Sequence, residues 1–252
     1  MNLRGISPST RIRQIMQSYD APIKNTDLVC FLDASDIASY PGFGTSWFDL
    51  SGNGKNATLV GEPQFISDNG GCFRFTSIST YATLPTPLLD ITSAGGNGSF
   101  ALEAWIRPTS VPNAINPILS INVSGSANNV SLVIASDRRF GINIGGTPTT
   151  QYHQTVATLN TWYHVVVSRD VGFASSVYNY FSRTTVNAVA STNAYLSDGA
   201  SVASSSPRIA GTSGNSNFFS GDIAQIRIYN NRFVSNDIYK NFAYHRSRFG
   251  VV

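Results

Sequence analysis

Charged residues are scarce in this sequence. Only 12% of its 252 residues are Asp, Glu, Lys or Arg, half the usual share of roughly 25%. The surface must therefore be built mainly from Ser, Thr, Asn and Gly, a composition typical of extracellular modules and virus shells. The 14 arginines and three lysines are scattered along the chain. They form no basic stripe with interleaved aromatics, so we expect no nucleic-acid binding.

Glutamate is nearly absent, which bears on catalysis. Glycoside hydrolysis needs two carboxyl groups that flank the scissile bond, and the chain contains only two glutamates, Glu62 and Glu103. Glu103 has Ala101 and Trp105 at the alternating positions of its strand, where a second carboxylate would have to stand. We therefore interpret Glu103 as a strand carboxylate that pairs with an arginine or with backbone amides. The sequence predicts no catalytic residue.

Patterns for a metal ion or an activated nucleophile are also missing. The three histidines, His153, His164 and His245, are far apart and lack the spacing of a metal site. His164 falls in an apolar strand and is predicted to be a hydrogen-bonded interior residue. No G-x-S-x-G segment occurs. We expect no metal and no cofactor.

One turn, residues 49–54, superficially resembles a calcium loop. Oxygen atoms of Asp49, Ser51 and Asn53 could converge there. However, Ca²⁺ takes roughly six to eight oxygen ligands and usually several carboxylates, and this turn contains one carboxylate. The alternative is an Asx-type turn that positions the second strand, and we prefer that interpretation.

Two cysteines are too few for a disulfide framework. Cys30 and Cys72 each lie inside an apolar run, which favours two buried thiols that act as small apolar side chains. A disulfide between them is the alternative if their strands are neighbours. No apolar run approaches the ~20 residues that span a bilayer, and residues 1–20 show no signal-peptide pattern. We expect neither a membrane segment nor a secretory signal.

From residue 27 onward, short apolar segments alternate with turns rich in Gly, Asn and Ser. In the clearest strand, residues 100–107, alternate residues from Phe100 to Ile106 are apolar and would face a core, and Pro108 is expected to end it. Further strands are predicted at 28–32, 73–75, 81–84, 118–123, 130–135, 140–144, 162–168 and 223–229, with two more inside 176–189 and a loop at 191–206. This pattern indicates an all-β, two-sheet antiparallel sandwich or jelly roll, followed by a short C-terminal helix.

Residues 1–26 form a separate segment ahead of the domain, which comprises residues 27–252. Ser7-Pro8 is a typical helix start. An apolar stripe at helical spacing consists of Ile12, Ile15, Met16 and Tyr19. The cations of the segment are Arg4, Arg11 and Arg13. So short a helix needs a surface to lie on, so we predict a partner-binding arm whose arginines pair with carboxylates of a neighbouring subunit.

Six segments carry a family resemblance. They are residues 28–34, 47–59, 71–75, 100–108, 162–169 and 219–230. Taken in this order, they resemble the laminin-G-like form of the concanavalin A-like lectin/glucanase superfamily. The resemblance implies a jelly roll over residues 27–250, of a kind that recurs in secreted carbohydrate-binding proteins and in phage and virus structural proteins. The sequence departs from the family pattern between residues 171 and 206, where the usual Asn-Gly turn is missing, and any binding loop there is in doubt.

These observations favour a non-enzymatic structural or decoration protein of a phage or virus particle, associated with its capsid or tail. Its partners would be other virion proteins or copies of itself, bound through the arm, and its lectin-like fold would contribute to adhesion to host glycans. An extracellular carbohydrate-binding module is the alternative, and a β-glucanase is less favoured. Sugars stack on exposed aromatic faces, and we predict that Tyr152, Tyr178 and Tyr180 are the exposed ligand-binding aromatics.

Overall fold

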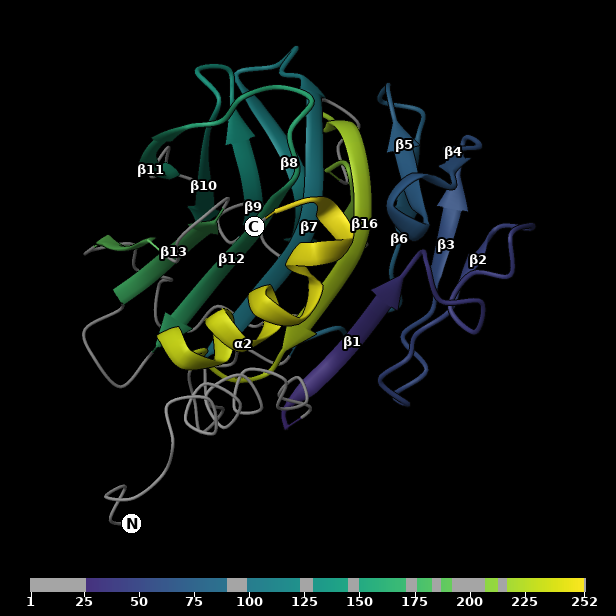
Figure 1. Cartoon of the computed structure of the whole chain (residues 1–252), viewed down its shortest axis with the longest axis horizontal. Helices are drawn as coiled ribbons and strands as arrows, with labels where there is room; N and C mark the ends of the chain where they lie inside the picture. Colours follow the sequence, from purple (N-terminus) through teal and green to yellow (C-terminus); the bar gives the residue numbers. More distant parts are fainter. Residues whose placement is uncertain are drawn as a thin grey trace, which may run out of the picture.

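The computed structural model of the chain describes residues 26–89, 99–122, 129–144, 150–170, 176–182, 187–191, 207–212 and 217–251. Within these ranges two antiparallel β-sheets face each other, and a short helix follows at the C-terminal end (Figure 1). The predicted jelly-roll sandwich with its C-terminal helix is thus confirmed. Residues 1–25 of the predicted arm (1–26) and residues 192–206 of the predicted loop (191–206) lie outside the described part of the chain.

Sheet A carries the longest strands. Its order is β14-β13-β12-β7-β16-β5-β4, and β1 pairs with the part of β16 that β5 leaves free. The strands of sheet A are β1 (Leu28–Asp33), β4 (Gln64–Ile66), β5 (Cys72–Phe75), β7 (Phe100–Ser110), β12 (Tyr163–Asp170), β13 (Ser176–Ser182), β14 (Asn187–Ser191) and β16 (Ser220–Tyr229). The two strands predicted inside 176–189 are therefore present as the antiparallel pair β13 and β14.

Sheet B has the order β11-β10-β9-β8-β15-β6-β3-β2. Its strands are β2 (Ser46–Trp47), β3 (Ala57–Val60), β6 (Tyr81–Thr83), β8 (Ile115–Asn122), β9 (Asn129–Ala135), β10 (Arg139–Ile144), β11 (Thr150–Val156) and β15 (Arg208–Ile209). The helical elements are η1 (Asp68–Gly70), α2 (Ser235–His245) and η2 (Arg246–Phe249). The strand ranges predicted from the sequence do not include β2, β3, β4, β11 or β15, because these strands are polar or only two to four residues long.

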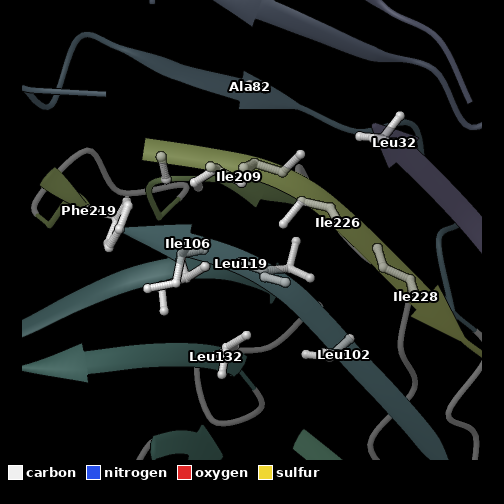
Figure 2. Packing of buried hydrophobic residues seen from close by; sticks show 14 of the residues in the cluster. Leu32, Ala82, Leu102, Ile106, Leu119, Leu132, Ile209, Phe219, Ile226 and Ile228 are labelled. Atoms are coloured by element: carbon white, nitrogen blue, oxygen red, sulfur yellow. The ribbon is translucent and has the colours of Figure 1, made fainter. Parts of the chain in front are cut away.

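The core lies between the two sheets. The alternate residues of β7 from Phe100 to Ile106 face inward, as their spacing predicts, and are fully buried. Sheet B contributes one cross-strand row of apolar side chains to this core. The row consists of Leu59, Ala82, Ile209, Leu119, Leu132 and Ile142. Figure 2 shows members of both groups packed together. Burial of each large aliphatic side chain contributes on the order of 1.5–3 kcal/mol before ordering costs.

The predicted end of β7 at Pro108 is wrong, because the strand continues to Ser110. The partner strand β12 stops pairing at Ile106, so beyond that point β16 is the strand that pairs with β7 on one side, while on the other side the Pro108 carbonyl accepts from the backbone N–H of Asn160. Pro108 pairs there with Gly221, next to an irregularity in the register. A proline is tolerated at such a position because the amide hydrogen it lacks is not needed for a second ladder.

The outer face of sheet A is covered by the C-terminal helix. Figure 1 shows α2 lying across β12, β7 and β16. Trp105 stacks on Phe242 of α2 with ring centroids 5.9 Å apart, and on Phe249 of η2 at 4.2 Å. The second face of β7 therefore uses Trp105 as the large packing residue that its sequence predicts. None of the described helices has the length and apolar character needed to cross a membrane.

The two cysteines are buried and carry free thiols. Cys30 faces the core between the sheets, whereas Cys72 belongs to the cluster beneath α2 and η2. The two side chains thus lie on opposite faces of sheet A, which explains why they do not bond. Burial raises the pKa of Cys72 to about 12, so the interpretation as inert apolar thiols is confirmed.

Candidate functional site

Glu103, the candidate acid of β7, points away from the core and lies beneath α2. Its Oε1 accepts hydrogen bonds from Arg227 Nη1 at 3.0 Å and from His164 Nε2 at 2.9 Å, and its Oε2 accepts one from Asn241 Nδ2 at 2.7 Å. Neighbouring strands of sheet A and helix α2 supply these donors, because β7 lies between β12 and β16. Both carboxylate oxygens are therefore engaged, and the predicted pairing of Glu103 with an arginine is confirmed.

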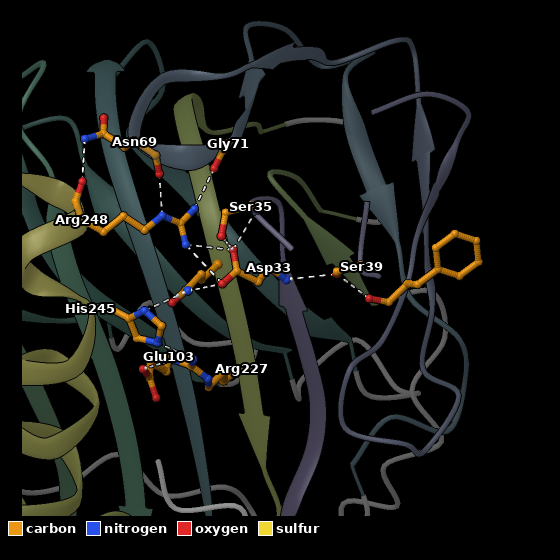
Figure 3. Close-up of polar contacts among 11 residues, drawn as sticks. Asp33, Ser35, Ser39, Asn69, Gly71, Glu103, Arg227, His245 and Arg248 are labelled. Atoms are coloured by element: carbon orange, nitrogen blue, oxygen red, sulfur yellow. Dashed lines mark hydrogen bonds and ion pairs between the residues drawn. The ribbon is translucent and has the colours of Figure 1, made fainter. Parts of the chain in front are cut away.

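A second group of polar side chains continues this network toward β1. Asp33 accepts from Arg248 Nη1 at 2.9 Å and from Ser35 Oγ at 2.8 Å, and it also contacts Gln225 Nε2. His245 of α2 bridges the two groups, with Nε2 at 2.8 Å from Arg227 Nη2 and Nδ1 at 3.3 Å from Gln225 Nε2. Figure 3 shows these side chains meeting between the helix and sheet A.

Arg248 anchors the last helical turn to the sheet. Besides Asp33, its guanidinium donates to the carbonyl oxygens of Asn69 at 2.5 Å and Gly71 at 2.9 Å. The side chain of Asn69 in turn accepts from Trp162 Nε1 at 2.9 Å. The C-terminal elements are thus held onto sheet A by charged hydrogen bonds as well as by aromatic packing.

The pKa shifts in this network follow from burial and from the arginine charges. Burial disfavours the ionised form of Glu103, but the charge of Arg227 and the hydrogen bond from His164 outweigh it and lower the pKa of Glu103 to about 2. Burial and the nearby Arg227 charge together lower the pKa of His245 to about 3. Because a guanidinium only donates hydrogen bonds, His245 Nε2 accepts from Arg227 and the imidazole is neutral.

The same arrangement recurs at Asp222, on the neighbouring part of β16. Its Oδ1 accepts from Arg74 Nε at 2.8 Å and its Oδ2 from Arg107 Nε at 2.7 Å. In the described part of the chain the buried carboxylates are Asp33, Glu103 and Asp222, and each is paired with at least one arginine. Each of these carboxylates is therefore held within the fold by charged hydrogen bonds from arginine.

The turn at residues 49–54 is an Asx-type turn, as preferred from the sequence. Asp49 Oδ1 accepts from the backbone N–H of Phe31 at 2.8 Å and of Ser51 at 2.9 Å. Its Oδ2 accepts from Ser51 Oγ at 2.7 Å and from the N–H of Lys55 at 2.9 Å. The carboxylate therefore ties the turn to β1. Across the ranges that the structure describes, no three His, Cys, Asp or Glu side chains gather as a possible metal-binding group.

A polar row, which the sequence pattern does not predict, crosses the outer face of sheet B. Residues that pair directly across neighbouring strands form this row, which we call the hydroxyl row. Its first half consists of Ser46 on β2, Thr58 on β3, Thr83 on β6 and Arg208 on β15. Its second half consists of Ser120 on β8, Ser131 on β9, Asn143 on β10 and Thr150 on β11. Each of the eight strands contributes one polar residue, next to the apolar row that faces the core.

The two halves of the hydroxyl row differ in exposure. Thr58 is exposed and Ser46, Thr83 and Arg208 are half-buried, whereas Ser120 and Ser131 are buried. The Ser131 hydroxyl donates to the Ser120 hydroxyl at 3.0 Å. Asn143, in the second half, is also half-buried, so what distinguishes the first half is that none of its four neighbouring residues is buried. Its arginine lies over the ring of half-buried Tyr81, with Cζ at 4.2 Å from the ring centroid.

The predicted ligand-binding tyrosines fall on both sheets. Tyr152 lies on β11 of sheet B, is half-buried, and has the guanidinium of Arg139 at 5.2 Å from its ring centroid. Tyr178 and Tyr180 lie two residues apart on β13 of sheet A, paired with Ser168 and Val166, and their side chains are outside the described part of the chain. The prediction that these three tyrosines bind a ligand stays a prediction.

The most exposed aromatic among the described residues is Phe43, at 75%. It stands between Gly42 and Gly44, whose φ angles of 93° and 84° are ones that side chains disfavour. The loop is closed at its base by Ser39, whose backbone and hydroxyl bond to the backbone of Phe48. Phe43 is not among the aromatic residues selected from the sequence. The flanking glycines were the available signal.

Two facing antiparallel sheets, one closed by a C-terminal helix and one with an open polar face, define a lectin-like jelly roll. The sequence matches the family model described as the concanavalin A-like lectin/glucanases superfamily over residues 75–238, which is more than half of the chain. The chain therefore belongs to that superfamily, and the resemblance seen in the six sequence segments is confirmed. No curated protein sequence matches the chain.

Solved structures with this fold include carbohydrate-active proteins and a toxin domain. The sialidase of Trypanosoma rangeli in complex with sialic acid is 19% identical, with a TM-score of 0.63 over 93% of this chain and 38% of the sialidase. Domain 4 of an extracellular arabinanase from Geobacillus stearothermophilus, in complex with arabinotriose, is 16% identical, with a TM-score of 0.61 over 86% of this chain and 98% of that domain. The botulinum neurotoxin type G receptor binding domain is 11% identical, with a TM-score of 0.60 over 86% of this chain and 51% of that one. At these identities the likeness establishes the fold, and the chain spans only 34% to 39% of the length of the sialidases.

Proposed function

We propose that this protein binds glycans without cleaving them and acts as an adhesion or decoration module. The single observation that carries the non-enzymatic part is the state of Glu103. Retaining or inverting hydrolysis needs one carboxyl group that can hold a proton and a second one across the scissile bond. Glu103 is buried under α2 with a pKa lowered to about 2, so it is ionised and out of reach of a substrate.

The glycan-binding part is supported by the fold and by the character of the open face. The chain shares its fold with an arabinanase domain in complex with arabinotriose and with a toxin receptor binding domain. The sequence of this chain is poor in charged residues and rich in hydroxyl and amide side chains, which make the directional, neutral hydrogen bonds that sugars require. These features favour a carbohydrate ligand over a highly charged polymer.

The second part of the proposal concerns where the module acts. We retain a phage or virus particle as the site of action, with the capsid or tail as the attachment point. The support is the predicted arm, because its apolar stripe and three arginines suit docking onto a subunit that presents carboxylates. An extracellular carbohydrate-binding module is the alternative, and it differs by needing no particle.

A glycan array tests the binding part directly. The intact chain should bind a subset of immobilised oligosaccharides in the absence of added metal. Absence of binding to every glycan on a broad array would count against the proposal. Co-purification of the chain with intact particles tests the site of action, and recovery of the chain only as a free secreted protein would favour the alternative.

A further inference from the structure

We propose that the glycan site is the open half of the hydroxyl row on sheet B, and that its ligand is an extended sugar chain lying across the strands. This assignment rests on the proposed glycan-binding function and adds the place and the direction of the ligand. The residues concerned are Ser46, Thr58, Thr83 and Arg208, on four neighbouring strands.

The hydroxyl groups of this half are available for a ligand. In the part of the chain that the structure describes, the hydroxyls of Ser46, Thr58 and Thr83 have no hydrogen-bond partner in the protein. Ser120 and Ser131, further along the same row, bond to each other instead. A hydroxyl both donates and accepts one or more hydrogen bonds, so three in line offer the pattern that successive sugar hydroxyls can match.

The geometry of the sheet sets the shape of the ligand. Directly paired residues on neighbouring strands follow one another at the strand spacing of about 4.8 Å, so four strands carry the row over about 14 Å. A single sugar cannot reach groups spread over that distance, whereas an oligosaccharide can contact all four. Arg208 is the only charged residue in the row, and its position over the Tyr81 ring at 4.2 Å holds the guanidinium against the sheet beside Thr83.

The part of the opposite outer face that lies beneath α2 does not offer a comparable surface. On sheet A the corresponding cross-strand rows consist of residues such as Trp105 and Gln225, or Glu103 and Arg227, and α2 covers them. The side chains of those rows lie beneath the helix, so a ligand from solution cannot reach them. The hydroxyl row is therefore the better candidate for a ligand that must come from solution.

The test uses the intact chain and the oligosaccharide series, one to five units long, of whichever glycan binds best on the array. The double variant Thr58→Val/Thr83→Val removes two hydroxyls and keeps the branched shape that suits a strand. Loss of two neutral hydrogen bonds predicts binding about tenfold weaker. Thr58→Ser/Thr83→Ser, which keeps the hydroxyls, should bind like the parent. Tyr244→Phe removes an exposed hydroxyl from α2, on the other side of the sandwich, and should also bind like the parent.

Affinity should also rise from the single sugar to the longer oligosaccharides, because the row is longer than one sugar. Unchanged binding by the folded Thr58→Val/Thr83→Val variant, or equal affinity for one and five units, would overturn the site assignment while leaving the proposed function standing. If the parent binds no glycan on the array, the proposed function fails and the site falls with it. Thermal melting of each variant confirms that it is folded.

Discussion

Arg227 and Glu103 face each other across the β16–β7 pair, 3.0 Å apart and almost completely buried beneath α2. The pairing keeps the Glu103 carboxylate ionised, and Glu103 is the strand residue that would have to serve as a glycosidase acid. The same arginine approaches His245 and lies over the ring of Phe31, with Cζ at 4.1 Å from its centroid. Arg227 therefore pairs with Glu103 and, through His245, also holds the C-terminal helix on the sheet.

Replacement of Glu103 should affect stability and not activity. Glu103→Gln leaves Arg227 buried without its counter-charge, which should lower the free energy of unfolding by about 3–5 kcal/mol. Glu62→Gln, at an exposed position, is the matched control and should change it by less than about 0.5 kcal/mol. Denaturant unfolding measures both. Neither the parent nor Glu103→Gln should hydrolyse a β-glucan, and hydrolysis by the parent that the variant loses would show that Glu103 is catalytic.

Acid should weaken the attachment of α2 through His245. The pKa of this group is about 3 in the folded protein, compared with an ordinary value of 6.5. The unfolded chain therefore binds a proton that the folded protein does not, so stability falls as the pH decreases from about 6.5 toward 3, by about 1.4 kcal/mol per pH unit. His245→Gln should remove that dependence between about pH 6.5 and 5, above the range in which Glu103, with its lowered pKa, loses its own contribution, and His153→Gln should retain it. Equal pH slopes for the parent and His245→Gln in urea titrations would contradict the neutral, buried state of His245.

The Asp49 turn should behave as a hydrogen-bonded turn and not as a metal site. Asp49→Ala removes four hydrogen bonds and should cost on the order of 2–4 kcal/mol of stability. Asp36→Ala, whose exposed carboxylate accepts from the N–H of Ala38, should cost less. A chelator should leave the Tm of the parent unchanged. A calcium-dependent rise in Tm that Asp49→Ala abolishes would mean that the turn binds the metal.

Deletion of residues 1–26 tests the predicted arm. The shortened chain should keep a Tm close to that of the parent, because the described core begins with β1 at Leu28. It should nevertheless fail to join particles or oligomers, and a full-length chain with Ile12→Ser and Met16→Ser should fail in the same way. Unfolding of the shortened domain, or assembly without the arm, would make the segment an internal brace.

Local patterns predicted the inward face of β7, the interior position of His164 and the pairing of Glu103 with an arginine. They could not identify which arginine, because Arg227 is 124 residues away in the sequence. They also gave the wrong end for β7 at Pro108, since the tolerance of a proline depends on where a neighbouring strand stops. Which arginine pairs with Glu103, and where a neighbouring strand stops, depend on how distant segments pair in the folded protein. Neither can be read from the periodic pattern of one segment.

The hydroxyl row illustrates the same limit more sharply. Ser46, Thr58, Thr83 and Arg208 come from strands of two to four residues, and each residue alone is an ordinary polar strand position. Their alignment exists only because three separate strand pairings share one register. The aromatic pattern that sequence reasoning could follow led to Tyr152, Tyr178 and Tyr180 instead.

The most direct test of glycan binding without cleavage follows the fate of one bound oligosaccharide. The best array ligand would be mixed with an equal amount of the parent protein, and calorimetry and mass spectrometry would be applied to the same sample after prolonged incubation. We predict saturable binding and recovery of the oligosaccharide at its original mass. Release of shorter products by the parent, and not by Glu103→Gln, would contradict the account.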